Sequence, residues 1–253
     1  MRKFARFLHK AAETDMKPRQ RLRLADNERV LYAIGDVHGC LDALLTLEEK
    51  IIEDAEKMTC EKLIIMLGDY IDRGPSSSEV IAHLLGDPPE GFERICLLGN
   101  HEAAMLDFLD GAIDLAAWES IGAEATLASY GIEIDARGRA RRERHVRDVI
   151  PDAHIAFMRG LPILVETERL VCVHAGLVPG RSIERQTDHD LIWSRPQGND
   201  FAHQKWVVHG HTPVDSVKRE GRRINVDTGA FYSGRLSALR VWNSKARILS
   251  NIT

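Results

Sequence analysis

Residues 62–75, KLIIMLGDYIDRGP, constrain the fold of this chain most strongly, because an apolar run ends there in a cluster of charged side chains. The apolar residues 63–67 have the length and the bounding glycine of a strand covered on both faces, as in an α/β sheet. Asp69, Asp72 and Arg73 follow in the loop after its carboxyl end, where open α/β sheets bind ligands. The stretch therefore predicts an α/β fold with a polar site at one sheet edge.

Two other segments repeat this order of an apolar run, a glycine and then side chains that can hold a metal. They are residues 30–39, VLYAIGDVHG, and residues 94–102, RICLLGNHE. Helical periodicity separates the three runs, which is typical of βαβ units with parallel strands. We expect strands over 30–34, 62–67 and 95–98, and helices over 41–57 and 76–85.

The remaining chain divides into a helical part and a β part. Residues 102–160 contain no comparable strand run, and we interpret them as an inserted helical cap. After Leu161 the residue pattern becomes typical of β-strands, and residues 163–165 and 170–173 predict a hairpin. Further short strands are expected near residues 207–208, 224–226, 236–242 and 246–249.

Composition excludes several classes of function. A length of 253 residues with 44% hydrophobic content supplies a sizeable core. A net charge of −4 gives no global attraction to nucleic acid, and no apolar run reaches membrane-spanning length. The start lacks the continuous apolar centre of a signal peptide. Four cysteines without a CxxC pair are typical of reduced thiols in the cytoplasm, although the spacing leaves a disulfide open.

The N-terminus differs in charge from the rest of the chain. Residues 1–24 carry eight Lys and Arg against two Asp and Glu. Apolar residues at helical spacing within it would suit a helix docked on its own domain, a partner-binding helix or a weak membrane-surface helix. We predict a basic extension over residues 1–28, docked or solvated, before a catalytic domain over residues 29–253.

The loops that follow the predicted strands contain the candidate functional residues. Their candidate metal ligands are hard or borderline, and none is a thiol: Asp36, His38, Asp69, Asn100, His174 and His211. This set suits Mn, Fe, Zn or Mg rather than a structural zinc site. Two cations sharing one carboxylate can activate a water for displacement at phosphorus.

Groups beside such a centre must neutralise phosphate and protonate the leaving oxygen. Arg73 and Arg195 have the planar fork that binds phosphate bidentately. His101 can be the acid, with Asp72 orienting its ring. Taken alone, Asp36, Asp69 and Asn100 could each cap a turn or a helix. His101 could merely pack beside Asn100, and Arg195 could lie in an ordinary surface loop.

The ordered motifs GDVHG (35–39), GDYIDRG (68–74), GNHE (99–102) and HAG (174–176) resemble the signature of the calcineurin-like metallophosphoesterases. Within that family, the motifs most resemble those of the phosphoprotein phosphatase branch and its bacterial members. The resemblance covers about residues 30–242 and leaves the basic N-terminus unexplained. It implies a four-layer α/β/β/α sandwich of mixed sheets, with a helical cap insertion.

The resemblance also implies roles for individual residues. Asp36 and His38 would bind the first metal and Asp69 would bridge, while Asn100, His174 and His211 would complete the second. His211 is preferred over His209 as the ligand from its position in HGHT, which gives His209 a supporting or packing role. Two divalent ions are expected, most readily Mn²⁺, with Fe, Zn and Mg as the other candidates.

Three functions follow from this resemblance. The first is a serine/threonine protein phosphatase that uses direct attack by a metal-bridging hydroxide. The second is a dinucleoside polyphosphate hydrolase, such as a diadenosine tetraphosphate hydrolase. That branch often lacks the Asp of DRG, so Asp72 favours the first function. The third, a non-catalytic scaffold, is disfavoured because the expected ligands and acid are present. The substrate would be a phosphorylated protein or a small phosphorylated molecule, and the oligomeric state is left open.

Overall fold

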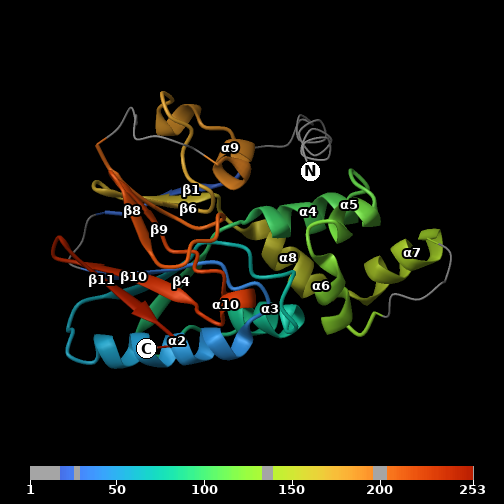
Figure 1. Cartoon of the computed structure of the whole chain (residues 1–253), viewed down its shortest axis with the longest axis horizontal. Coiled ribbons are helices and arrows are strands. Elements are labelled where there is room, and N and C mark those ends of the chain that lie inside the picture. Colours follow the sequence, from blue (N-terminus) through green and yellow to red (C-terminus); the bar gives the residue numbers. More distant parts are fainter. Residues whose placement is uncertain (1–17, 26–28, 133–138, 196–203, 253) are drawn as a thin grey trace.

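The computed structural model describes residues 18–25, 29–132, 139–195 and 204–252. Its strands form two mixed sheets (Figure 1). The five-stranded sheet has the order β11-β10-β2-β3-β4, and the six-stranded sheet the order β1-β5-β6-β7-β9-β8. Helices lie outside both sheets, which confirms the predicted α/β class with two mixed sheets.

The five-stranded sheet carries the three motif strands at its centre. Strands β2 (Val30–Ile34), β3 (Lys62–Met66) and β4 (Phe92–Cys96) pair in parallel. Strands β10 (Ser237–Trp242) and β11 (Lys245–Ser250) complete the sheet with antiparallel pairing. Because β2, β3 and β4 run in the same direction, their carboxyl ends meet at one edge.

Alternate residues of these strands enter two different cores. Leu31, Ala33, Leu63 and Ile65 face the six-stranded sheet and belong to the apolar cluster between the sheets. Their neighbours Val30, Tyr32, Ile34 and Ile64 instead belong to the cluster that includes the buried side of the helix α2 (Leu41–Ala55). Burial on both faces explains why these strands read as continuous apolar runs.

The six-stranded sheet is built mainly from short strands. They are β1 (Arg21–Arg23), β5 (Leu164–Glu166), β6 (Leu170–Val173), β7 (Trp206–His209), β8 (Lys218–Glu220) and β9 (Arg223–Asn225). The 3₁₀ turn η1 (Ile183–Arg185) and the helix α9 (Asp188–Trp193) follow β6, and α9 lies above the sheet in Figure 1. The antiparallel pairing of β5 with β6 confirms the predicted hairpin.

Helices fill the region between β4 and β5 and lie at one end of the sheets (Figure 1). They are α4 (Asn100–Leu109), α5 (Leu115–Glu119), α6 (Ala123–Ser129), α7 (Arg139–Val149) and α8 (Asp152–Gly160). The helix α3 (Ser77–Leu85) contacts α6 and α8. The described part of the stretch predicted as a helical cap thus consists of helices joined by turns and contains no strand, and its boundaries as an insertion stay a prediction.

The structure differs from the sequence prediction at three strands. Strand β4 begins at Phe92, earlier than the predicted Ile95, because Glu93 and Arg94 interrupt the apolar pattern that locates strands. Strand β8 was not predicted, since its sequence KRE is wholly exposed. Strand β1 lies within the predicted N-terminal extension yet pairs in parallel with β5. Its RLR sequence has too little apolar content to be recognised.

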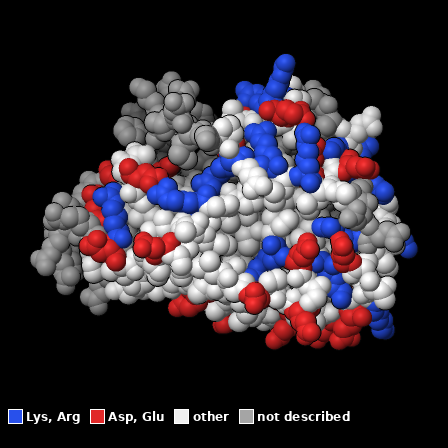
Figure 2. Space-filling view, turned by 180° about the vertical axis from the view of Figure 1, so that it is seen from behind, with Lys and Arg blue, Asp and Glu red and all other residues white. Residues whose placement is uncertain are grey.

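Several other sequence predictions concern the surface. All four cysteines have free thiols. Within the described ranges, no helix is long and apolar enough to cross a membrane. Basic and acidic side chains are interspersed on the face seen in Figure 2, and acidic ones gather along its lower edge. The predicted N-terminal helix falls in residues 1–17, outside the described part of the chain.

Candidate active site

The loops after β2 and β3 are joined directly to one another. The backbone N–H groups of Val37 and His38 both donate to the Asp69 carbonyl, at 3.1 and 2.9 Å. The side chains of His38 and Asp69 therefore meet at the sheet edge, with 3.6 Å between His38 Nε2 and Asp69 Oδ2. The His38 Nδ1 lies 2.8 Å from the Ile71 carbonyl, which orients the ring.

Asp69 occupies the centre of the cluster. Its Oδ2 lies 3.4 Å from His174 Nε2 and 3.8 Å from His101 Nε2, and its Oδ1 accepts from the His101 N–H at 3.0 Å. Burial alone would raise the pKa of Asp69, but the facing His174, His101 and His38 hold it well below the usual range. A fully buried carboxylate that stays ionised is suited to bind cations.

Two groups of candidate metal ligands share this carboxylate. The first is His38, Asp69 and His101, and the second is Asp69, His174 and His211. Within each group the ligand atoms lie within 4.8 Å of one another, and every member is buried. Asp69 alone belongs to both, as expected for a ligand that bridges two ions.

Asn100 and Asp36 join the cluster through His211. Asn100 Oδ1 lies 2.7 Å from His211 Nδ1 and 2.9 Å from His174 Nε2. Asp36 accepts from the His211 N–H at 3.0 Å, and a Cβ at Gly210 would lie 1.9 Å from Asp36 Oδ1, so only glycine permits this approach. All six predicted ligands therefore lie together, although Asp36 and Asn100 belong to neither three-residue group.

Unpartnered buried atoms fit the addition of metal ions. His211 Nε2 and Asp227 Oδ2 are buried and have no hydrogen-bond partner among the described residues. Burial, followed by the neighbouring Asp227 and Asp69, raises the pKa of Asp36 well above its usual value. Buried carboxylates that repel one another, beside an imidazole nitrogen without a hydrogen-bond partner, fit the binding of cations.

The backbone is strained at the same positions. Seven described residues other than glycine have positive φ, and five of them are predicted site residues: His38, Asp69, Asp72, Arg73 and His211, with φ between 46° and 70°. Such conformations cost on the order of 1 kcal/mol each and persist where the surroundings hold them in place. The strain is concentrated at the site.

Glu102 is the clearest residue that the sequence analysis left without a role. Its Oε2 accepts from the N–H groups of Asp69 and Gly99, and its Oε1 from those of Tyr70 and Ile71, at 2.7 to 3.2 Å. Burial and the nearby Asp69 raise the pKa of Glu102 to about 7, while the amide groups oppose this rise. One side chain thus fixes the loop that presents Asp69. Its place in the GNHE motif was the available signal.

His101 and Asp72 form a buried pair. His101 Nδ1 lies 2.7 Å from Asp72 Oδ2, which also accepts from Trp118 Nε1 at 3.1 Å. Asp72 Oδ1 accepts from Thr126 Oγ1 at 2.6 Å. Burial would lower the pKa of His101, but Asp69 and Asp72 raise it overall. Trp118 and Thr126 come from α5 and α6, so the helical region helps to position the pair, which no local sequence pattern revealed.

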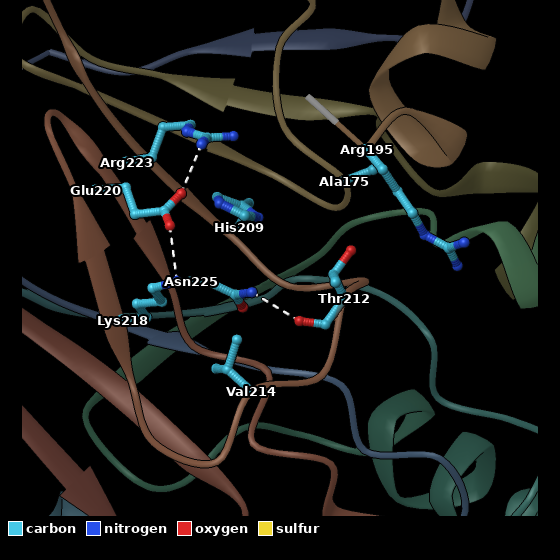
Figure 3. A pocket seen from close by; sticks show the side chains of 9 residues that line it. All are labelled: Ala175, Arg195, His209, Thr212, Val214, Lys218, Glu220, Arg223 and Asn225. Atoms are coloured by element: carbon cyan, nitrogen blue, oxygen red, sulfur yellow. Dashed lines mark hydrogen bonds and ion pairs between the residues drawn. The ribbon is translucent and has the colours of Figure 1, made fainter. Parts of the chain in front are cut away.

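The two predicted phosphate-binding arginines are placed differently. Arg73 is exposed, and its Nη2 lies 3.1 Å from His101 Nε2 while its guanidinium stacks on the Phe231 ring at 4.8 Å. Arg195 is also exposed, and it lines a pocket beside His209 and Thr212 (Figure 3). Arg73 therefore belongs to the cluster, and Arg195 belongs to its rim.

The chain belongs to the calcineurin-like phosphoesterase family, whose model matches residues 30–236. This membership makes it a hydrolase of phosphate esters, in a family with a dinuclear metal site.

Among curated relatives, the bis(5′-nucleosyl)-tetraphosphatase PrpE [asymmetrical] of Bacillus subtilis (strain 168) is 27% identical over 82% of this chain and 88% of the relative. The protein of that name from Bacillus thuringiensis (strain Al Hakam) is 26% identical, with the same coverage.

The descriptions of solved structures with a similar fold name several different activities. A putative diadenosine tetraphosphatase has a TM-score of 0.64 at 18% identity, covering 92% of this chain and 98% of that one. A serine/threonine phosphatase from Saccharomyces cerevisiae has a TM-score of 0.58 at 14% identity, and the match covers 98% of this chain and 89% of that one. A cold-active protein-tyrosine phosphatase from a Shewanella species has a TM-score of 0.54 at 17% identity, and the match covers 92% of this chain and 82% of that one. At these identities the likeness shows the fold alone.

Proposed function

We propose that this chain is a two-metal hydrolase that cleaves dinucleoside polyphosphates, with bis(5′-nucleosyl) tetraphosphates as the substrate class. The reaction rests on one observation, the buried Asp69 carboxylate shared by two groups of metal ligands. His38 and Asp36 would hold one ion, Asn100, His174 and His211 the other, and Asp69 both. Two divalent ions, preferably Mn²⁺, would polarise the phosphoryl oxygens and activate water.

The chain's own residues would bind the phosphate and move the proton. A guanidinium can only donate, so the contact from Arg73 requires His101 Nε2 to be unprotonated, with the proton on Nδ1 facing Asp72. An acid role requires a proton on Nε2. Arg73 must therefore turn from His101 to the substrate phosphate when His101 becomes charged, and Asp72 then stabilises the imidazolium.

The names of the relatives support the choice of substrate. The presence of Asp72 in the sequence favours a phosphoprotein, with the dinucleoside polyphosphate as the alternative. Relatives that match 82% of the chain are named as tetraphosphatases, and we therefore place that alternative first.

A serine/threonine protein phosphatase is the second candidate, and the Asp72–His101 pair favours it. A serine alkoxide is a strongly basic leaving group that needs a proton in the transition state. A triphosphate is a weakly basic leaving group and needs that proton far less. Asp72 is buried and accepts hydrogen bonds from Trp118 and Thr126, which fixes it as the partner of His101. This arrangement therefore suits a phosphoserine substrate better than a nucleotide.

A comparison of substrates tests the proposal. We expect kcat/KM with Mn²⁺ to be at least about tenfold higher for bis(5′-adenosyl) tetraphosphate than for a phosphoserine peptide, a difference of roughly 1.4 kcal/mol in transition-state binding. Asymmetrical cleavage should yield AMP and ATP rather than two ADP. A higher value for the phosphopeptide would reject the nucleotide substrate in favour of the second candidate.

A further inference from the structure

A pocket of about 260 Å³ adjoins the candidate metal centre. Two of its lining residues, Ala175 and Thr212, directly follow the proposed ligands His174 and His211 in the chain (Figure 3). A substrate held at the metal centre could therefore extend into this pocket.

The lining is rich in positive charge. Three of the lining residues are basic, Arg195, Lys218 and Arg223, and one is acidic, Glu220, which forms ion pairs with Lys218 and Arg223 at 2.8 Å. Arg195 lies across the pocket from this group (Figure 3), and it forms no ion pair with a residue that the structure describes. The lining thus contains more basic than acidic side chains, as a site for an anion requires.

The size of the pocket limits what it can hold. Pockets for drug-sized ligands begin at about 300 Å³, and this one is smaller. One or two phosphate groups would fit in it and leave room for water. Charge and size together point to the phosphate chain of a substrate rather than to its nucleosides.

We propose that this pocket binds the phosphates beyond the one under attack, so that Arg195, Lys218 and Arg223 select polyphosphates over monophosphates. The inference rests on the proposed function and deepens it by naming the residues that would set substrate class. Charged hydrogen bonds to phosphate are the interactions expected here. A substrate with a single phosphate would bind at the metal centre without entering the pocket.

Lys218 is the residue to change, because its side chain is 59% exposed and a substitution should not disturb folding. The measurement is the ratio of kcat/KM for bis(5′-adenosyl) tetraphosphate to that for p-nitrophenyl phosphate. We expect this ratio to fall about fivefold in Lys218→Ala and about 30-fold in Lys218→Glu. Lys245→Ala, an exposed lysine in the edge strand β11, is the matched control and should leave the ratio unchanged.

A second measurement does not require cleavage of the tetraphosphate. Inorganic tripolyphosphate and inorganic phosphate compete with p-nitrophenyl phosphate at constant free Mn²⁺, which corrects for chelation. We expect tripolyphosphate to inhibit at least about tenfold more tightly than phosphate, and the difference to shrink in Lys218→Glu but not in Lys245→Ala.

The two measurements separate the failure of the pocket from that of the proposed function. If the tetraphosphate is not cleaved but the preference for tripolyphosphate depends on Lys218, the pocket stands and the substrate assignment fails. If the tetraphosphate is cleaved while Lys218→Glu and Lys245→Ala give equal ratios and equal inhibition, the function stands and the pocket proposal is overturned.

Discussion

The two sheets contribute to the site in different ways. On the five-stranded side, the loops are tied by buried hydrogen bonds, with four backbone amides on Glu102 and three side chains on Asp72. On the six-stranded side, His211 Nε2 has no described hydrogen-bond partner, and the next residue, Thr212, lines a pocket that also includes the exposed Lys218. We infer that the first side holds the proposed acid and the shared carboxylate, and that the second adds the ligands His174 and His211 and selects the substrate. Changes on the two sides should therefore have different signatures.

The largest effect should come from the residue where the two sides meet. Asp69→Asn removes the carboxylate from both ligand groups, and we expect kcat/KM to fall by about 10⁴ or more on every substrate. Metal analysis should find about two ions per chain in the native protein and fewer than one in the variant. His38→Asn, which affects one group alone, is the control and should retain about one ion. One ion or none in the active native protein would refute the two-metal site.

A smaller loss of activity, which depends on the substrate, is expected when the proposed acid His101 is replaced. His101→Asn should reduce kcat by about 10² to 10⁴ on phosphoserine, whose leaving oxygen needs a proton, and much less on p-nitrophenyl phosphate. Asp72→Asn should show the same pattern in weaker form, because it leaves the ring in place but removes its charged partner. Equal losses on both substrates would argue against proton donation. A trapped phosphohistidine would instead assign His101 as a nucleophile.

The rigidity of the five-stranded side can be tested through stability. Glu102→Gln replaces one acceptor oxygen with an NH₂ group that faces backbone N–H donors, so we expect unfolding to become easier by about 2 to 4 kcal/mol. Denaturant unfolding measures this change. Glu49→Gln, on the exposed face of α2, is the control and should stay within about 0.5 kcal/mol. A Glu102 variant as stable as the control would show that the loop does not depend on this carboxylate.

The smallest effect on activity should come from the N-terminus. Deletion of residues 1–17 should leave kcat/KM on p-nitrophenyl phosphate within a few fold, since all the proposed ligands and catalytic residues lie within the matched family domain, residues 30–236. Deletion of residues 1–24 also removes β1 and the Arg21 guanidinium, which donates to the Ile183 and Gln186 carbonyls at 2.9 and 2.6 Å. That longer deletion should lower Tm. A large loss of activity in the shorter deletion, with metals retained, would place the segment at the site.

Local pattern was sufficient for the part of the site on the five-stranded sheet. Parallel strands end at one edge, so the polar residues after residues 30–34, 62–67 and 95–98 had to come together. Burial of both sheet faces made these strands visible as apolar runs. The positions of His38, Asp69 and Asn100 relative to the strands were therefore determined by the sequence alone.

Only the tertiary structure decided what surrounds them. Trp118 and Thr126 reach Asp72 from helices 46 and 54 residues away in the chain, and Glu102 acts through backbone amides that have no sequence signature. The pocket joins Arg195 to Lys218 and Arg223, which lie on a loop and on two short strands of little apolar content. Long-range contacts of this kind depend on how the layers pack, and packing brings residues together without leaving a periodic pattern along the chain.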